Sequence, residues 1–428
     1  MKLANLKGTD DFLPKEQVIR NEIINTLKNH FESYGYLPIE TPILNYYELL
    51  AYKYSDDAEI LNEVYKLKDQ GDRNLGLRYD LTVPFCKVIG INKGLQMPFR
   101  RYEIGKVFRN GPVKLGRTRE FYQCDIDVVG IDNRLIEVEQ ILMAINGFKK
   151  LGIDVNVKYN NRKLMSGLII EVGIDEDSVS SVIGIIDKME KISLEELIDN
   201  LEEINIPKTK IDKLLECFKY TFEDYERMFN GTDNSYIKDG LAELKELREY
   251  FERLDIVDDC IFSPTLARGL TIYTGVVFEF YDKEKRIASA IGAGGRYNKI
   301  ITDFMNNGEN YPAIGLSFGL EPIYAILKDK NDSDCLIDVY LVPLDTNIET
   351  LKLATKLREN GIKVLIEMNK RKVRKCFEYA ERERINYIGI VGSNEIEEEK
   401  ITLKNMQTKE EITLKFEEIV DFLTKKEK

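Results

Sequence analysis

The sequence predicts a mixed α/β fold of two or three domains, and three stretches of its 428 residues carry this prediction. Residues 99–130 are predicted to form a long antiparallel hairpin, with arms RRYEIGKVF and EFYQCDIDVV around the turn-rich loop NGPVKLGRT. Residues from about 165 to 250 form a charged block with helical periodicity. After residue 335, helix and strand patterns alternate, which is typical of a compact α/β domain with a partly parallel sheet.

Hydrophobic spacing and turn residues predict the elements that precede the hairpin. Residues 15–34 carry apolar side chains at near-helical spacing and stop at Gly35, so we expect an amphipathic helix. The segment YLPIETPIL should be extended, because Pro38 and Pro42 restrict the residues before them. In LGLRYDLTVPFCKVI we expect a strand that turns into a helix at about Pro84.

The rest of the chain suggests an insertion and a domain boundary. A capping box from Ser193 to Glu196 opens a helix in the charged block, and strand patterns return in SPTLARGLTIYTGVVFEFYD and RIASAIGAGGRYNKI. The polar segment KDKNDSD resembles a linker. We therefore expect a first domain over 1–328 with a helical insertion at approximately 165–250, and a second over 333–428.

Within the second domain the pattern predicts a strand in CLIDVYLVPLD and six further elements. They are a helix over 348–360, the strand KVLIEM, a helix over 370–384, the strands NYIGIVG and KITLKNM, and a helix over 416–424.

Composition narrows the classes of function. The net charge of −12 argues against nucleic-acid binding over the whole surface, although it permits local basic patches. Six scattered cysteines form no CxxC pair, and a single histidine, His30, leaves no histidine cluster for a metal or a catalytic triad. We expect His30 to be structural and half-buried in its helix. No segment resembles a signal peptide or a membrane span, so a cytoplasmic protein is expected.

The hairpin presents one chemically unusual face. Alternate residues of a strand share a face, and the second arm therefore lines one side with Arg119, Phe121, Gln123, Asp125 and Asp127. On the first arm the corresponding residues are Arg101, Glu103, Val107 and Arg109. Arginines near the loop and carboxylates farther in suit a ligand with an anionic end and a cationic end, such as a nucleotide phosphate beside an amino acid ammonium group. A solvated hairpin with cross-strand salt bridges is the alternative.

Three other motifs add polar residues near predicted strand ends. LRYDLTVPF places Asp80 and Thr82 on one face, and LARGLTIYTG brings Arg268 and Tyr273 through a turn. GAGGRY matches neither a dinucleotide-binding fingerprint nor a phosphate-binding loop. Its glycines suggest close backbone packing beside a ligand, with Tyr297 at the rim.

Taken in order, these segments resemble the histidyl-tRNA synthetase family of class II aminoacyl-tRNA synthetases over essentially the whole chain. GYLPIETPIL, FRNGPVKLGRTREFYQCDIDVVG and AIGLSFGLEPI resemble the three class II motifs, and LARGLTIYTG and GAGGRYNKI the family's two histidine-binding signatures. Residues 335–428 resemble its anticodon-binding domain. The resemblance implies a catalytic domain with the class II antiparallel sheet, a helical insertion and a C-terminal α/β domain.

The resemblance also implies a role for each matching residue. The α-amino group of histidine would be held by Asp80, Thr82 and Gln123. The imidazole nitrogens would be held by Asp127 and Tyr273, with Tyr297 nearby. Contacts to ATP would come from Arg109 and Arg268 at the α-phosphate, Phe121 on adenine and Arg117 near the outer phosphates.

The implied reaction is attack of the histidine carboxylate, which Arg109 would also contact, on the α-phosphorus of ATP, followed by transfer to tRNA(His). It needs no protein nucleophile, because alignment and charge neutralisation suffice. Mg²⁺ would accompany ATP rather than occupy a site of its own. A homodimer is expected, because the first motif forms the dimer interface in this family.

The sequence departs from the family pattern at four positions. Gly111 replaces a glutamate that reads adenine, Thr271 and Ile272 replace Asp and Tyr, and Pro322 replaces an arginine that holds the γ-phosphate. Two alternatives therefore stay open. One is a histidine sensor similar to the regulatory subunit of ATP phosphoribosyltransferase, which typically lacks the C-terminal domain, and the other is a paralogue that activates histidine for a different acceptor.

A basic cluster in NKRKVRK near an expected helix start suggests a contact with RNA phosphates. Cations at a helix N-terminus oppose the helix dipole, which makes a purely structural role less favourable. A solvated helix end is the alternative. The cluster consists of Lys370, Arg371, Lys372, Arg374 and Lys375.

Overall fold

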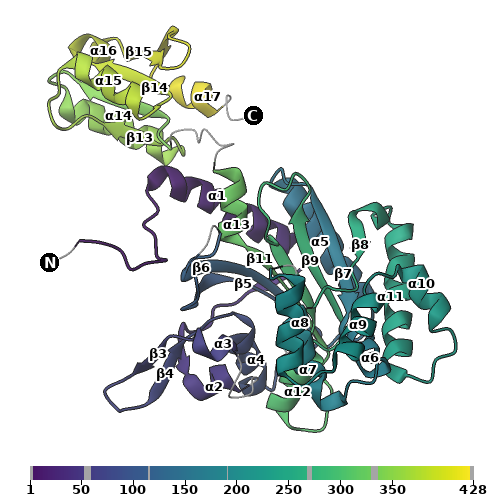
Figure 1. Ribbon diagram of the computed structural model, residues 1–428. Helices are drawn as coiled ribbons and strands as arrows, with labels where there is room; N and C mark the ends of the chain where they lie inside the picture. Colours follow the sequence, from purple (N-terminus) through teal and green to yellow (C-terminus); the bar gives the residue numbers. More distant parts are fainter. Residues whose placement is uncertain are drawn as a thin grey trace. The chain divides into compact units, whose positions relative to one another are not determined.

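The computed structural model describes residues 3–52, 59–113, 116–189, 191–267, 272–328 and 336–424. The chain divides into two compact units, Met1–Lys330 and Asn331–Lys428. We refer to them as the N-terminal and C-terminal units (Figure 1). Within the described ranges, no helix combines the length and the apolar character that crossing a membrane requires.

An eight-stranded sheet forms the centre of the N-terminal unit, in the order β1-β5-β6-β11-β10-β9-β7-β8. The pairs β1–β5 and β7–β8 are parallel and the others are antiparallel. The predicted hairpin is confirmed as β5 and β6. The strands are β1 Leu37–Pro38, β5 Phe99–Phe108, β6 Glu120–Val129, β7 Val155–Asn161, β8 Cys260–Phe262, β9 Val276–Asp282, β10 Gly292–Arg296 and β11 Ala313–Gly319.

Apolar helices cover one face of this sheet. The predicted first helix is α1, Pro14–Ser33, and it packs with α5, Leu135–Lys150, against β5, β6, β7 and β11. Leu27 and Phe31 of α1 are fully buried, and Phe31 contacts Phe318 of β11 with ring centroids 5.4 Å apart. The helix α13, Leu320–Leu327, follows β11 directly and packs against α1.

A second core covers the opposite face of the sheet, where the candidate site lies. It joins α4 and α12 to a separate antiparallel sheet of order β2-β4-β3. These elements are β2 Leu44–Tyr46, α2 Tyr47–Ala51, α3 Glu59–Asn62, β3 Lys66–Lys68, β4 Asn74–Leu77, α4 Thr82–Ile91 and α12 Asn298–Met305. The strand-to-helix transition expected at Pro84 occurs slightly earlier, because β4 ends at Leu77 and α4 begins at Thr82.

Helices occupy the chain between β7 and β8, within the N-terminal unit (Figure 1). The capping interaction expected at Ser193 is present, since its hydroxyl accepts a hydrogen bond from the Glu196 amide. The elements are α6 Arg162–Glu171, η1 Glu176–Ser178, α7 Val179–Ile186, α8 Leu194–Glu203, α9 Lys208–Cys217, α10 Phe222–Met228, α11 Ser235–Arg253 and η2 Val257–Asp259. That they constitute an inserted domain stays a prediction.

The C-terminal unit is an α/β sandwich around a five-stranded sheet of order β13-β12-β14-β15-β16. Its first three strands are parallel and the last two antiparallel, as the predicted partly parallel sheet requires. The sequence pattern missed β16 and α16. The elements are β12 Val339–Pro343, α14 Asn347–Glu359, β13 Val364–Ile366, α15 Val373–Arg382, β14 Tyr387–Val391, α16 Ser393–Glu397, β15 Lys400–Asn405, β16 Glu411–Lys415 and α17 Ile419–Thr424.

Candidate active site

The β5–β6 register brings the predicted polar residues together on one face of the sheet. Since directly opposed residues of an antiparallel pair share a face, the register confirms the predicted arrangement. The opposed pairs are Arg101 with Asp127, Glu103 with Asp125, Gly105 with Gln123, and Val107 with Phe121.

Arg101 and Asp127 form a buried ion pair at the centre of this face. Nη2 of Arg101 lies 2.5 Å from Oδ2 of Asp127, and the two residues are 0% and 2% exposed. The guanidinium also lies 4.4 Å from the ring centroid of Phe85 on α4, which is close enough for a cation–π contact. A buried charge is costly unless paired, so this arginine holds the Asp127 carboxylate in place.

A second buried ion pair flanks the first. Nη1 of Arg78 lies 2.8 Å from Oε1 of Glu103. Glu103 also accepts hydrogen bonds from the amide and the hydroxyl of Thr41, both at 2.9 Å. Arg78 occupies the space beside Gly105, where a Cβ would lie 2.3 Å from Nη2. Glycine is therefore needed at this position of β5.

Burial changes the acidity of the two aspartates on β6. It raises the pKa of Asp127 to about 6, against the opposing effects of Arg101 and of the hydrogen bond from Tyr297. It raises the pKa of Asp125 to about 7, although Arg101 again opposes the shift. Neighbouring carboxylates, including Asp80, add to the shift of both groups. Burial thus favours the protonated form of both carboxyl groups, and a cation bound beside them would favour the ionised form.

Two tyrosines and two glycines frame Asp127. The hydroxyl of Tyr297, which is 2% exposed, donates to Oδ1 of Asp127. A Cβ at Gly315 would lie 2.2 Å from that same oxygen, and a Cβ at Gly295 would lie 2.9 Å from the ring of Tyr273. The glycines of the GAGGRY segment and of β11 thus allow the close backbone approach that the sequence suggested.

Asp80, Thr82 and Gln123 lie along the same side of the sheet. Asp80 is buried, and its Oδ1 accepts a hydrogen bond of 3.0 Å from the Val83 amide, while Thr82 is the first residue of α4. Nε2 of Gln123 donates to Oγ of Ser317 at 3.1 Å. Oε1 of Gln123 is buried and has no hydrogen-bond partner in the described part of the chain.

Two of the predicted anion-binding residues, Arg109 and Arg117, lie in the described part of the hairpin and its loop. Nε of Arg109 donates to the Tyr79 carbonyl at 3.0 Å, and its guanidinium carbon lies 5.2 Å from the centroid of the Phe121 ring. Arg117 is exposed. Arg268 and Thr271 lie outside the described residues.

Gly111 and Pro322, two of the positions at which the sequence departs from the family pattern, lie in the described part of the chain. A Cβ at Gly111 would lie 2.5 Å from Oε1 of Glu63, so another carboxylate occupies the space beside this glycine. Pro322 is the third residue of α13, and its ring lies 3.1 Å from where a Cβ of Gly319 would be. Proline is compatible with the first turn of a helix, where backbone amides have no intrahelical acceptor.

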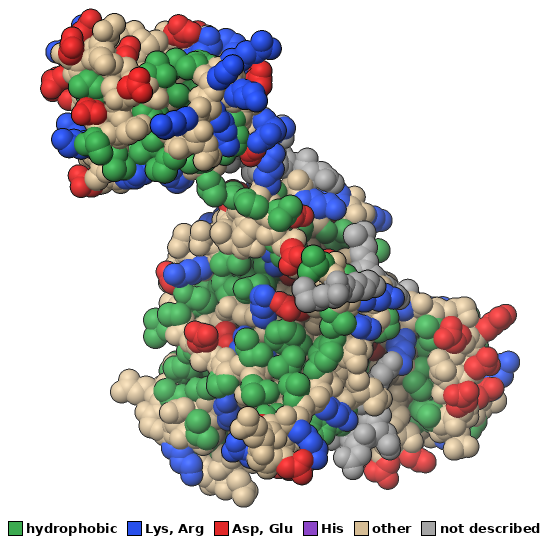
Figure 2. All heavy atoms as spheres, turned by 90° about the vertical axis from the view of Figure 1, so that its left-hand side faces the viewer, with side chains coloured by type: hydrophobic (Ala, Val, Ile, Leu, Met, Phe, Trp, Pro, Cys, Tyr) green, Lys and Arg blue, Asp and Glu red, His purple; other side chains and the backbone are tan. Residues whose placement is uncertain are grey.

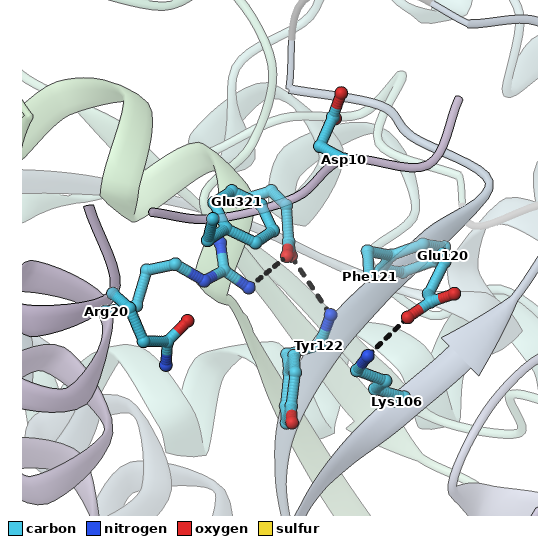
Figure 3. Close-up of a pocket in the computed structure, with 9 residues that line it drawn as sticks. Asp10, Arg20, Lys106, Glu120, Phe121, Tyr122 and Glu321 are labelled. Atoms are coloured by element: carbon cyan, nitrogen blue, oxygen red, sulfur yellow. Dashed lines mark hydrogen bonds and ion pairs between the residues drawn. The ribbon is translucent and has the colours of Figure 1, made fainter. Parts of the chain in front are cut away.

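A cavity of about 120 Å³ lies at the same hairpin, beside α1 and α13 (Figure 3). Nη2 of Arg20 pairs with Oε1 of Glu321 at 2.8 Å, and Oε2 of Glu321 accepts from the Tyr122 amide at 3.1 Å. Figure 3 shows Glu321 between Arg20 and the Tyr122 backbone, with the paired Lys106 and Glu120 along the hairpin. The Glu321 carboxylate therefore fixes the start of α13 to both α1 and β6.

His30 has a structural position. Its Nε2 lies 2.8 Å from the Met143 carbonyl, and burial lowers the pKa of the imidazole. It is only 2% exposed, so the expectation of a half-buried side chain was wrong in degree. The close packing of α1 on α5 explains the difference.

The basic cluster of the C-terminal unit is exposed and partly paired. Arg371 pairs with Glu367 at 3.1 Å, and Arg374 pairs with Glu378 at 3.1 Å. The three lysines of the cluster form no ion pair with another described residue. They are Lys370, Lys372 and Lys375. The helix starts slightly later than expected, since α15 begins at Val373.

Comparison with known protein families agrees with this geometry. The family model described as "Histidyl-tRNA synthetase" matches residues 8–323. The chain belongs to the histidyl-tRNA synthetase family. The model described as "Anticodon binding domain" matches residues 338–426. These matches confirm the family and the C-terminal domain type that the sequence motifs predicted.

Members of the histidyl-tRNA synthetase family resemble this chain over its full length. Histidine–tRNA ligase 1 of Bacillus cereus is 44% identical over 98% of this chain and 97% of its own, and histidine–tRNA ligase of Clostridium tetani is 32% identical over 99% and 98%. The crystal structure of histidyl-tRNA synthetase from Nostoc sp. PCC 7120 covers 100% of both chains with a TM-score of 0.84 and 26% identity. The mixed fold with a C-terminal α/β domain is confirmed.

The sequence predicts that several of these residues share a face, but it assigns no role to Arg101 or Arg78. Arg101 was placed on the correct face, and its pairing with Asp127 follows once the hairpin register is known. Arg78 lies just before Asp80 in a motif that had been noted, but its partner Glu103 comes from another sheet strand. No local pattern indicates that contact.

We predict that Gly315→Ala disturbs the Asp127 carboxylate and lowers the free energy of unfolding by about 1–3 kcal/mol, as overpacking of a filled site does. Gly184→Ala is the matched control, because nothing lies within 4 Å of a Cβ there, in helix α7. It should raise stability by about 0.5–1 kcal/mol. Chemical denaturation of both variants measures the difference. Equal effects of the two substitutions would show that the space around Asp127 is not filled as described.

Proposed function

We propose that this protein is a histidine–tRNA ligase, which activates histidine with ATP and transfers it to tRNA(His). The observation that carries the proposal is the acidic face around Asp127 next to Arg109 and Phe121 at the hairpin end. Carboxylates suit the cationic part of an amino acid, and an arginine beside a partly exposed aromatic ring suits a nucleotide phosphate and its base.

Histidine is recognised through both nitrogens of its imidazole. Asp127 accepts from one nitrogen and Tyr273 contacts the other, while Tyr297 and Arg101 hold the Asp127 carboxylate in position. An isosteric ligand without these nitrogens would leave buried polar groups unpaired, which costs about 1–3 kcal/mol each. Asp80, Thr82 and Gln123 receive the α-amino group.

Activation joins two anions, the histidine carboxylate and the α-phosphate of ATP. Arg109 contacts both, and Arg268 contacts the α-phosphate from the other side. These cations offset the charge that develops in the transition state, and they remain protonated throughout. Phe121 stacks on adenine, and Mg²⁺ arrives with ATP, bound mainly by its phosphates.

Gly111 and Pro322 lack the side-chain groups that the family pattern uses to bind ATP, and two other residues can take over these roles. The Glu63 carboxylate beside Gly111 supplies the acceptor for the adenine amino group that Gly111 lacks. Pro322 carries no charge to hold the γ-phosphate. Arg117 is exposed on the loop that follows Arg109 and takes over this role when the loop closes over the outer phosphates.

The C-terminal unit reads the tRNA, and its basic cluster contacts the RNA backbone. Figure 2 shows lysine and arginine side chains gathered along one side of this unit. The N-terminal unit forms a homodimer through the segment of the first motif. Apolar side chains in or directly after this segment are exposed, namely Leu37 62%, Ile43 42%, Leu44 49% and Tyr46 56%. Figure 2 also shows hydrophobic side chains on the visible face of this unit.

One observation favours a second candidate function. Pro322 removes a cation from the ATP site, which suits a protein that binds histidine without activating it. A structure from Bacillus halodurans C, titled "ATP phosphoribosyltransferase regulatory subunit/histidyl-tRNA synthetase", shares the fold with a TM-score of 0.76 at 21% identity. The match of residues 338–426 to an anticodon-binding domain favours the ligase.

Attachment of labelled histidine to tRNA(His) in the presence of ATP tests the proposed function. A ligase produces histidyl-tRNA that is stable to precipitation and labile to base. A histidine sensor binds the amino acid but leaves the tRNA unlabelled, and a paralogue with another acceptor forms the adenylate without charging tRNA.

We predict that Arg117→Ala raises the KM for ATP about tenfold or more with little change in the KM for histidine. The reason is that a charge-assisted contact to phosphate contributes roughly 1.5–3 kcal/mol. Pyrophosphate exchange at varied ATP measures the effect. Arg227→Ala, at a side chain 78% exposed in the helical block, is the control and should leave both constants unchanged. A normal KM for ATP in Arg117→Ala would mean that another group holds the outer phosphates.

We also predict that combined replacement of Lys370, Lys372 and Lys375 by alanine lowers kcat/KM for tRNA at least tenfold while pyrophosphate exchange is retained. Each lost phosphate contact should also weaken the salt dependence of charging. Replacement of Lys352 and Lys356, two exposed lysines of α14, is the matched control. Unchanged charging by the triple variant would assign the cluster to the solvated surface.

A further inference from the structure

Asp125 is the one carboxylate on the site face of β6 to which neither the sequence motifs nor the proposed mechanism assigns a role. It lies between Gln123 and Asp127, on the same side of the strand, and it is 4% exposed. On the neighbouring strand β11 it is opposite Ser317, whose hydroxyl interacts with its carboxylate. It therefore stands between the residues proposed for the α-amino group and the residue proposed for the imidazole.

The two other buried carboxylates of the hairpin, Asp127 and Glu103, each lie in an ion pair with an arginine. Asp127 pairs with Arg101 at 2.5 Å, and Glu103 pairs with Arg78 at 2.8 Å. Among the described residues Asp125 has no such cation, since Arg101 acts on it only as a longer-range charge. Its Oδ1 atom is buried and has no hydrogen-bond partner in the described structure. An unpaired buried acceptor of this kind is unfavourable unless a ligand or water satisfies it.

A second unpaired acceptor lies next to it. Oε1 of Gln123 is also buried without a partner, while Nε2 of the same side chain is taken up by Ser317. The two unpaired oxygens belong to residues 123 and 125, which point to the same side of β6. An ammonium group offers three donors and no acceptor, so it matches a pair of unpaired acceptors.

We propose that Asp125 is an additional ligand-binding residue, whose Oδ1 receives the α-ammonium group of the amino acid together with Oε1 of Gln123. The proposal rests on the proposed function and adds a residue that determines which ligands bind. Asp127 is paired with Arg101 and can accept from an uncharged imidazole, whereas Asp125 has no paired cation among the described residues and can take the ammonium cation as its partner. Ligands without an amino group are thereby excluded.

The release of protons from Asp125 when the ligand binds provides an independent test of this contact. The groups that face it are Arg101 and Glu103 from β5, Asp127 from β6, Asp80 before α4 and Tyr297 after β10. Burial raises the pKa of Asp125 to about 7, so the carboxyl group is partly protonated near neutral pH in the free protein. An ammonium cation favours the ionised form and lowers this pKa, so binding at pH 7 releases protons.

Calorimetry on the full-length protein tests the proposal with two ligands, histidine and 3-(imidazol-4-yl)propionate, which lacks the amino group. Asp125→Asn should weaken histidine binding about 10- to 100-fold, as loss of a charge-assisted hydrogen bond does. Binding of the amino-free analogue should change less than about twofold. Titration at pH 7 in buffers of different ionisation enthalpy should show fewer protons released by the variant.

Two further variants make the result specific. Ser317→Ala removes the hydroxyl beside Asp125 without removing a charge, and it should weaken histidine binding severalfold with the analogue again unaffected. Asp72→Asn is the control, because the Asp72 side chain is 82% exposed. It should leave the affinity for both ligands unchanged. Should Asp125→Asn fail to fold, Ser317→Ala alone decides the question through the same comparison of ligands.

The proposal is wrong if Asp125→Asn weakens both ligands equally, or neither, because either result assigns Asp125 a purely structural role. If the wild-type protein binds histidine and Asp125→Asn affects both ligands equally or neither, this inference is wrong and the proposed function is unaffected. A wild-type protein that does not bind histidine at all overturns the proposed function, and the inference with it.

Discussion

In the middle of an eight-stranded sheet, the guanidinium of Arg101 and the carboxylate of Asp127 meet at 2.5 Å, where neither side chain reaches solvent. Such a pair is stable only when geometry and secondary contacts offset the cost of removing both charges from water. Here Phe85 lies over the guanidinium and Tyr297 donates to the carboxylate. The surrounding fold therefore has to place elements from distant parts of the chain around one cross-strand contact.

The same constraint explains the unusual backbone of the neighbouring strands. The Asp127 carboxylate and the ring of Tyr273 take up volume in which ordinary side chains of β10 and β11 would stand, and glycines at 295 and 315 leave that volume free. On the reverse face, the Glu321 carboxylate links α13 to α1 and to the Tyr122 amide. The buried polar groups of the candidate site thus lie on one face of the sheet, and the ion pair that anchors α13 lies on the other.

Sequence patterns predicted the parts of this arrangement that depend on local periodicity. The strand period of two placed Gln123, Asp125 and Asp127 on one face, and the turn-rich loop indicated the hairpin that brings Arg101 opposite them. Contacts between segments distant in the chain could not be predicted in this way. Arg20 and Glu321 are 301 residues apart, and nothing in either local segment indicates the partner.

The elements that the sequence pattern missed in the C-terminal unit also depend on contacts between segments. The strand β16, EITLK, alternates polar and apolar residues but has only five residues and no fully buried side chain. Its pairing with β15 shows it to be a strand. The resemblance to a family supplied roles that patterns could not, such as the separate tasks of Asp127 and Asp80. It gave no role to Arg101 or to Asp125, whose contacts with Asp127 and Ser317 become visible only in the folded sheet.

The central claim is that an intact amino acid site operates with an altered ATP site. Histidine-dependent exchange of labelled pyrophosphate into ATP tests it most directly, because exchange requires the adenylate to form and reverse. With full-length protein at millimolar ATP, we expect exchange that depends on histidine and saturates only at high ATP concentration. Histidine binding by calorimetry together with no exchange at millimolar ATP would contradict the claim and identify the protein as a histidine-binding regulator.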